Sequence, residues 1–257
     1  MKGRLLKFRG RPLTFRRVKE YIARPIDKVK WKLYVKYYIP YKANKIREQK
    51  EIRVLFVLAE LGSWKTEELY IRMLAHNRFR PILGVTTSQE VTGSKASLIK
   101  YIESRGYNYV DLDSGRSIMG SLKADIIFYY KPYHASYPEG IYIENNMKSL
   151  FCMINYTFNQ GNTPYAFHHD LWHLSWKVFA ENITVIETAR QVLGREVNNF
   201  YPTGTPVQDV LRKDKITFKN PWKSCGPKKK IIYAPHHSLK GTNGDHIEYA
   251  TFLELRS

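Results

Sequence analysis

An almost uninterrupted apolar run, Ile52 to Ala59, constrains this chain more than any other feature. All of its residues except Arg53 are aliphatic or aromatic. This composition is typical of a strand that is buried on both faces of a parallel sheet. Gly62 and Ser63 follow, and a helical pattern begins with Thr66 as its expected N-cap. The apolar face of that helix is expected to comprise Leu69, Tyr70, Met73 and Leu74.

The alternation of strand and helix continues along the chain. Further strands are expected at 81–85, 107–112, 124–130 and 149–156, and helices at 96–105 and around 187–193. This alternation predicts a doubly wound α/β sheet. Pro and Gly mark a turn-rich connection from Asn198 to Asp209, and a fresh strand is expected from Lys228, followed by a helix near Glu248.

Three parts are therefore expected. Residues 1–50 form a basic, aromatic-rich and helical segment, and residues 51–203 form a Rossmann-like domain. Residues 204–257 contain an interdomain junction and the incomplete start of a second α/β domain.

The positive charge is concentrated in the first part. Residues 1–50 hold 17 Lys and Arg against three Asp and Glu, a net charge of +14 out of +19 for the whole chain. Pro25 and Pro40 are expected to punctuate two helices there. Cations interleaved with Trp and Tyr are typical of a segment that lies at a lipid headgroup interface. A solvated arm whose aromatic side chains pack on the body is the alternative. No recognised nucleic-acid module accompanies the charge, so nucleic acid is not expected as a partner.

Several protein classes are excluded by composition. Two cysteines, Cys152 and Cys225, are too few for a disulfide scaffold or a Cys-rich metal site, and they suit a reducing cytosol. The longest apolar run, residues 54–59, is about a third of a bilayer span. The basic N-terminus is not followed by the apolar region of a signal peptide. We expect a cytoplasmic protein at the inner face of the membrane, and no cofactor.

Ligands of open α/β sheets bind beyond the carboxyl ends of the strands, so the residues after each expected strand are candidates. Glu60–Ser63 is neither a dinucleotide fingerprint nor a P-loop. Lys131 and His134 follow the fourth strand and can meet a phosphate, although a lone loop histidine is often incidental. Tyr156 ends the fifth strand.

A second group of histidines follows. His168, His169 and His173 come after the fifth strand, and the i,i+4 spacing of the last two would suit one helix face. The Glu of HExxH and a third ligand are missing, so no metal is expected. General-base or phosphate contact and structural hydrogen bonding both remain open. His236, His237 and Ser238 follow a later strand, where they can donate hydrogen bonds to phosphate oxygens.

Three stretches together resemble the CDP-glycerol glycerophosphotransferase family, the teichoic-acid-polymerase-like transferases with a GT-B fold. They are Phe151–Tyr156, Pro202–Asp209 and Lys230–Ser238. In the second, Gly204, Pro206 and Asp209 supply a pattern similar to the family's G-x-P-x-x-D junction; the third is similar to the strand and A-P loop that open its nucleotide-binding domain. The resemblance implies an acceptor-side N-terminal domain, a C-terminal CDP-alcohol-binding domain and peripheral attachment to the membrane.

Two departures from the family pattern stand out. The W-H-G-T motif is replaced by Asn155–Phe158, so its histidine has no counterpart here. The chain also ends near the start of the nucleotide-binding domain, so we expect it to be a fragment or a truncated product.

The expected function is transfer of a glycerophosphate-like or glycosyl group from a CDP-activated donor to a cell-surface polymer or lipid-linked acceptor. His169 or His134 would be the base, and His236, His237 and Ser238 would bind the donor phosphate. Lys131, Tyr156 and His168 would lie on the acceptor side. The alternatives are a nucleotide-sugar glycosyltransferase of capsule synthesis and a non-catalytic basic membrane or nucleic-acid adaptor.

Overall fold

The computed structural model describes residues 7–8, 11–12, 29–114, 117–157, 167, 169–206 and 208. The chain divides into two compact units, residues 1–214 and 215–257. The second unit lies outside the described residues, and with it the expected phosphate-binding residues His236, His237 and Ser238. His168, expected on the acceptor side, also lies outside them.

A parallel sheet forms the centre of the first unit. Within the described residues it has seven strands in the order β5-β4-β3-β6-β7-β8-β9, and every neighbouring pair is parallel. The strands are β3 (Ile52–Leu58), β4 (Phe79–Val85), β5 (Tyr109–Asp111), β6 (Ile126–Tyr129), β7 (Leu150–Ile154), β8 (Lys177–Ala180) and β9 (Phe200–Pro202). A short antiparallel pair, β1 (Lys7–Phe8) and β2 (Arg11–Pro12), precedes the sheet in sequence. The predicted α/β class is confirmed.

Strand β3 is formed by the apolar run at residues 52–58 and lies third in the order of the seven described strands. Every one of its residues except Arg53 is buried, because β4 and β6 flank it and helices cover both faces. The chain moves outward from β3 through β4 to β5, then returns to β6 on the other side of β3. The strand order therefore reverses between β3 and β6, which is the position where open α/β sheets bind their ligands.

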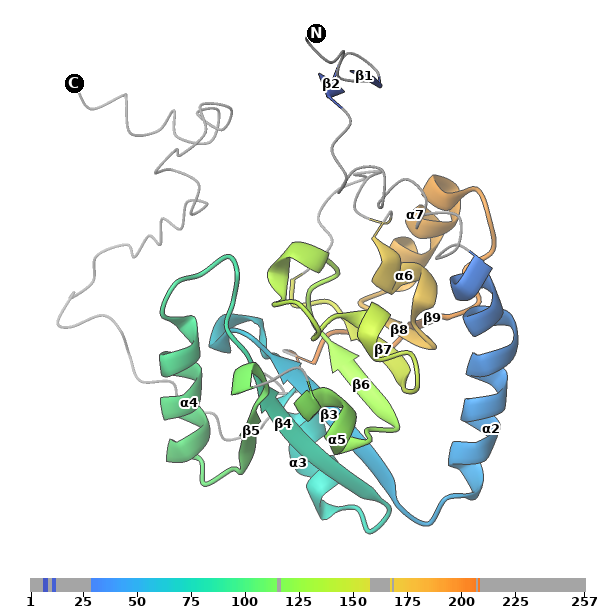
Figure 1. Cartoon of the computed structure of the whole chain (residues 1–257). Helices are drawn as coiled ribbons and strands as arrows, with labels where there is room; N and C mark the ends of the chain where they lie inside the picture. The colour runs from blue at the N-terminus through green and yellow to red at the C-terminus, as the bar shows by residue number, and fades with distance from the viewer. Residues whose placement is uncertain are drawn as a thin grey trace, which may run out of the picture. The chain divides into compact units, whose positions relative to one another are not determined.

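Helices cover the sheet on both faces (Figure 1). The side chains of α3 (Glu67–Ala75) and α4 (Ser94–Ser104) share one core cluster, which includes Phe56 of β3. The opposite cluster receives α5 (Ser117–Leu122), α6 (Asp170–Leu174) and α7 (Ile183–Leu193). Local residues set both ends of α7. At its start, Asn182 Oδ1 accepts a hydrogen bond from Val185 N (3.1 Å), and at its end Gly194 adopts a left-handed conformation with φ 59°.

A helix formed by the end of the basic segment crosses the amino ends of the strands. Residues 29–33 are helical, Tyr34–Tyr38 form a π-helical stretch, and α2 runs from Ile39 to Glu48. The hydroxyl of Tyr34 donates to Ser149 O (2.7 Å), just before β7, and Lys42 Nζ lies 2.7 Å from Asp125 Oδ1, just before β6. The described part of this segment thus packs on the body.

Pro40 does not separate two helices, contrary to expectation. It occupies the first turn of α2, where its missing N–H removes no α-helical hydrogen bond. The π-helical stretch before it lets the helix continue through the proline.

Thr66 is the N-cap of α3, as expected, although its side chain makes no capping hydrogen bond and its hydroxyl pairs with the Tyr130 hydroxyl instead. Three details of the other expected elements were wrong. Leu74 is 50% exposed and does not belong to the core. Strand β8 was missed, and β9 lies in the stretch expected to be only a turn-rich connection. Proline is tolerated in β9 because this strand lies at the edge of the sheet.

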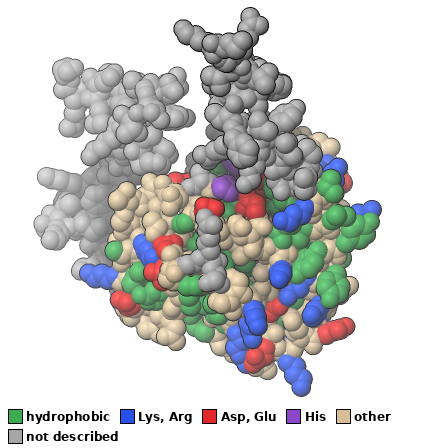
Figure 2. Space-filling view, viewed as in Figure 1, with side chains coloured by type: hydrophobic (Ala, Val, Ile, Leu, Met, Phe, Trp, Pro, Cys, Tyr) green, Lys and Arg blue, Asp and Glu red, His purple; other side chains and the backbone are tan. Residues whose placement is uncertain are grey.

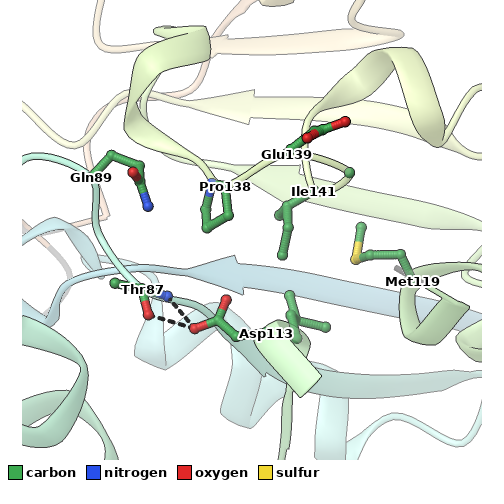
Figure 3. A pocket seen from close by; sticks show the side chains of 9 residues that line it. Thr87, Gln89, Asp113, Met119, Pro138, Glu139 and Ile141 are labelled. Carbon is green, nitrogen blue, oxygen red and sulfur yellow. Dashed lines mark hydrogen bonds between the residues drawn. The ribbon is translucent and has the colours of Figure 1, made fainter. Parts of the chain in front are cut away.

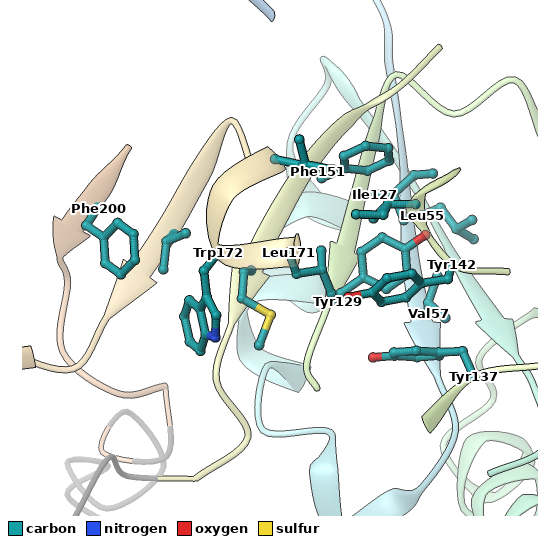
Figure 4. Packing of buried hydrophobic residues seen from close by; sticks show 14 of the residues in the cluster. Leu55, Val57, Ile127, Tyr129, Tyr137, Tyr142, Phe151, Leu171, Trp172 and Phe200 are labelled. Carbon is teal, nitrogen blue, oxygen red and sulfur yellow. The ribbon is translucent and has the colours of Figure 1, made fainter. Parts of the chain in front are cut away.

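Three buried tyrosines hold the long connection after β6 against the sheet (Figure 4). Tyr129 donates its hydroxyl hydrogen to Ile141 O, and Tyr142 donates to Pro132 O, each at 2.7 Å. The Tyr137 hydroxyl accepts from Lys131 N at 3.1 Å. Because these hydroxyl groups are satisfied by backbone atoms of the connection itself, residues 131–142 have a fixed course at the carboxyl edge of the sheet.

None of the helices in the part of the chain that the structure describes has the length and apolar character needed to cross a membrane.

Candidate functional site

The carboxyl ends of β3 and β6 are joined by an ion pair at the point where the strand order reverses. Glu60 lies two residues beyond β3, and Lys131 lies two residues beyond β6. Lys131 Nζ is 2.7 Å from Glu60 Oε1. Since parallel strands end at one edge of the sheet, two side chains that are distant in sequence meet at the usual ligand position of this architecture.

A third loop joins the same cluster. Glu90, from the connection between β4 and α4, places Oε2 at 2.6 Å from Lys131 Nζ. Ser88 donates to Glu60, and Ser136 donates to Glu90. Lys131 therefore ties the connections that follow β3, β4 and β6 into one network.

The ammonium of Lys131 is deeply buried and fully charged. Its side chain is 5% exposed, and burial by itself would lower its pKa. Hydrogen bonds and electrostatic attraction from Glu60 and Glu90 outweigh that burial, so the pKa of Lys131 is raised above its usual value. The group is a fixed cation and is not suited to accept a proton at neutral pH.

Tyr156 completes the cluster at the end of β7. The centre of its ring lies 5.4 Å from Lys131 Nζ, within the range of a cation–π contact. The structure thus brings together two of the residues predicted for the acceptor side, Lys131 and Tyr156.

A second polar network lies beside the first, at the ends of β4 and β5. Asp113 accepts hydrogen bonds from the hydroxyls of Thr86 and Thr87 and from Thr87 N (2.9 Å). Lys95 Nζ lies 2.7 Å from Asp113 Oδ2 and 2.6 Å from Asp111 Oδ1. Burial would raise the pKa of Asp113, but the hydrogen bonds from Lys95, Thr86 and Thr87 outweigh it and lower that pKa. Asp113 is therefore a carboxylate at neutral pH.

A cavity of about 420 Å³ opens between these loops (Figure 3). One wall comes from the connection after β6, and the facing wall comes from the ends of β4 and β5 together with α5. The lining residues are Thr87, Gln89, Leu112, Asp113, Met119, Pro138, Glu139, Gly140 and Ile141. The cavity adjoins the Lys131 cluster in sequence and in space, because Gln89 precedes Glu90 and Pro138 follows Ser136 by two residues.

The two histidines expected to act as base lie on the connections after β6 and β7. His134 Nε2 is 3.4 Å from Glu144 Oε1, and its ring packs edge-on against Tyr142 at 4.9 Å. His169 packs edge-on against Tyr133 at 4.8 Å, so the two connections are in contact. The side chain of His134 is 67% exposed, and His134 is not among the described residues that line the cavity.

His169 and His173 do not share a helix face. His169 is the N-cap of α6 and has extended backbone angles, whereas His173 lies in the last turn. The Nδ1 atom of His173 is 2.7 Å from Arg195 Nη2. Among the described residues, no group of three or more His, Cys, Asp or Glu is arranged to hold a metal ion.

Four residues of the Lys131 cluster were missed by the sequence analysis: Glu60, Ser88, Glu90 and Ser136. Glu60 lies just beyond the most strongly predicted strand, and this position alone could have identified it as a candidate site residue. Glu90 and Ser136 lie five and seven residues beyond their strands, where only the folded loops bring them back to the sheet edge.

No known protein family and no curated protein matches the sequence. Among solved structures, a Neisseria meningitidis UDP-GlcNAc 2-epimerase, solved with UDP-GlcNAc, shares 12% identity at a TM-score of 0.46 over 62% of this chain and 48% of its own. The S. aureus protein MnaA, solved with UDP, shares 12% identity at a TM-score of 0.48 over 68% and 48% of the two chains.

A Listeria monocytogenes protein assigned as a UDP-N-acetylglucosamine 2-epimerase shares 11% identity at a TM-score of 0.45, over 65% of this chain and 50% of its own. This chain spans about half the length of each neighbour. Two of these neighbours are named as UDP-N-acetylglucosamine 2-epimerases and the third was solved with UDP, and none of the three names refers to CDP-glycerol transfer. The α/β class stated above rests on the strand order and pairing of this chain.

Proposed function

We propose that this chain provides the acceptor-side domain of a transferase that uses a nucleotide-activated donor. The group transferred is glycerophosphate-like, from CDP-glycerol, and the acceptor is a polymer or a lipid-linked molecule. The resemblance in residues 151–156, 202–209 and 230–238 supports the choice of donor. The second candidate is a nucleotide-sugar glycosyltransferase, which would use the same sheet edge.

The observation that carries the proposal is the Lys131–Glu60 ion pair at the strand-order reversal, with a 420 Å³ cavity beside it. A buried cation held by two carboxylates fixes three loops around the position where α/β enzymes bind ligands. Preorganised loops of this kind reduce the entropy lost when reactants are aligned.

The chemistry differs between the two candidates in a measurable way. In glycerophosphate transfer, an acceptor hydroxyl oxygen forms a bond to the β-phosphorus of CDP-glycerol while the bond from that phosphorus to the bridging oxygen breaks, and CMP leaves. In glycosyl transfer from a UDP-sugar, the oxygen attacks the anomeric carbon and UDP leaves. In both, His169 or His134 would take the hydroxyl proton. His236, His237 and Ser238 would stabilise the donor phosphates.

The proposal includes attachment to the inner face of the membrane through the helix at residues 29–48. Its outer face carries four exposed side chains at i,i+4 spacing: Val29, Leu33, Tyr37 and Tyr41 are 59%, 53%, 57% and 61% exposed. Exposed Lys30, Lys36 and Lys45 accompany them. Hydrophobic and basic side chains intermingle along this edge of the molecule (Figure 2). Aromatic residues flanked by cations suit an anionic lipid surface.

The test is a donor panel with product analysis. The protein is incubated with CDP-glycerol, UDP-glucose or UDP-N-acetylglucosamine, with membranes of the cells that make it as acceptor. CMP release that depends on membranes supports glycerophosphate transfer, and membrane-dependent UDP release with a labelled polymer supports glycosyl transfer. The His134→Asn and His169→Asn variants are compared with Lys100→Met, an exposed substitution on α4.

A decrease of about a hundredfold in one histidine variant would identify the base, since general-base catalysis contributes roughly that much or more. Absence of nucleotide release with every donor, while the protein binds anionic vesicles, would favour the non-catalytic membrane adaptor.

A further inference from the structure

We propose that the cavity between the ends of β4 and β5 and the connection after β6 binds an uncharged polyhydroxylated group, either a polyol or a sugar ring. The assignment of this group to the acceptor rests on the proposed function. The ligand chemistry itself rests on the cavity alone.

The size of the cavity fits a ligand of this class. Its volume of about 420 Å³ falls within the range of roughly 300–1,000 Å³ that small-molecule sites occupy. The walls belong to different connections, which face each other across the opening (Figure 3).

The charge of the lining disfavours a phosphate or a diphosphate. Asp113 and Glu139 are carboxylic residues, and none of the described lining residues is Lys or Arg. The nearby Lys95 ammonium is already bonded to both Asp111 and Asp113. An anionic ligand would therefore be repelled by the carboxylates of Asp113 and Glu139. The Lys95 ammonium does not offset this repulsion, because it is shared between Asp111 and Asp113.

The remaining lining groups suit a ligand with hydroxyl groups on a carbon skeleton, such as a polyol or a sugar ring. Leu112, Met119 and Ile141 line the cavity but are only 2%, 6% and 3% exposed, so the apolar surface that they present to C–H groups is small. The Gln89 side chain is exposed toward the opening, and its amide can both donate to and accept from hydroxyl groups. Small-molecule sites commonly combine mostly apolar walls with a few placed polar groups.

The Lys131 cluster keeps the two walls in place. Glu90 follows Gln89 directly and is bonded to both Lys131 and Ser136. Ser136 lies two residues before Pro138 on the opposite wall. Both walls are thus anchored to one buried cation, so the cavity is largely formed before a ligand arrives.

The test is direct binding to the whole 257-residue protein, measured by saturation-transfer NMR and chemical-shift titration. The probes are glycerol, ribitol, N-acetylglucosamine and inorganic phosphate. Gln89→Trp fills the opening and should abolish binding of the uncharged probes. Gln89→Leu removes the amide but keeps the size, and should weaken binding about fivefold to tenfold. Gln191→Leu, at an exposed position of α7, is the matched control and should not change binding.

Two results would overturn the proposal. One is the absence of saturable binding by any of the three uncharged probes, or binding that Gln89→Trp leaves unchanged. The other is tighter binding of phosphate at residues 87–89 and 138–141 than of the uncharged probes. Neither result depends on transfer activity, so a failure of this proposal is distinguishable from a failure of the proposed function.

Discussion

The ammonium of Lys131 lies 2.7 Å from a carboxylate oxygen of Glu60, although the two residues are 71 positions apart in the sequence. The pair joins the ends of β3 and β6, the two adjacent strands between which the chain reverses its direction of sheet growth. Glu90 adds a second carboxylate to the same cation. The architecture of the site can therefore be tested through this one side chain.

Replacing Lys131 with Met should lower the free energy of unfolding by about 3 kcal/mol, because two carboxylates lose their buried partner. Urea denaturation at pH 7 measures the change. Lys100→Met is the matched control, and it should change stability by less than about 0.5 kcal/mol because Lys100 is exposed. Equal effects of the two substitutions would show that the Lys131 cluster does not hold the loops together.

The Asp113→Asn variant should reveal a pH-dependent contribution to stability. The pKa of Asp113 is lowered in the folded state by hydrogen bonds from Lys95, Thr86 and Thr87, which outweigh burial. A carboxyl group with a depressed folded pKa stabilises the fold above its unfolded pKa, about 3.9, and this contribution disappears as the pH falls through the folded value. The wild type should be more stable than the variant at pH 7, and the difference should shrink below about pH 4.

Urea denaturation between pH 7 and pH 3 provides the measurement for Asp113. A difference between the two proteins that stays constant over this range would mean that the ionised form of Asp113 receives no net stabilisation in the folded state.

The hydroxyl of Tyr34 fastens the basic helix to the body, so Tyr34→Phe should destabilise the protein by about 1 kcal/mol. The loss arises because the buried carbonyl of Ser149 loses its donor. Tyr37→Phe is a close control, since Tyr37 lies three residues away on the same helix and is 57% exposed. Its effect should stay within about 0.5 kcal/mol. Thermal or chemical denaturation that ranks Tyr37→Phe as the more harmful change would contradict this packing.

The exposed stripe on the same helix should bind anionic vesicles. Cosedimentation with vesicles that contain phosphatidylserine should decrease as salt is raised, because screening acts over about 8 Å at physiological ionic strength. The triple variant Lys30→Glu, Lys36→Glu and Lys45→Glu should lose most of the binding. Each basic residue near such a surface contributes about 1 kcal/mol.

The matched control for the vesicle experiment reverses three exposed lysines away from this helix, Lys65→Glu, Lys100→Glu and Lys123→Glu. If neutral and anionic vesicles bind equally, or if the control variant loses as much binding as the triple variant, the helix is not the lipid-binding surface.

Local sequence patterns were sufficient for the centre of the fold. The apolar run at β3 has one favourable environment, a strand covered on both faces, and the helical periodicity at α4 and α7 has one buried side. The bounds of β3 and α4 were predicted nearly correctly because their preference is set by neighbouring residues, whereas α7 begins four residues earlier than expected. Strands β8 and β9 were not predicted, because they are short and are stabilised mainly by pairing with the strand beside them.

In the candidate site, too, local sequence determined some features and tertiary contacts determined the others. The sequence determined that polar residues follow the strands, and so identified Lys131, His134, Tyr156 and His169 as candidates. It did not determine that Lys131 is buried between Glu60 and Glu90, or that His169 caps α6 and contacts Tyr133. Only the tertiary structure decided these contacts, because they depend on strand order and on the paths of three loops. Ion pairs between residues 41 and 71 positions apart leave no local periodicity in the chain.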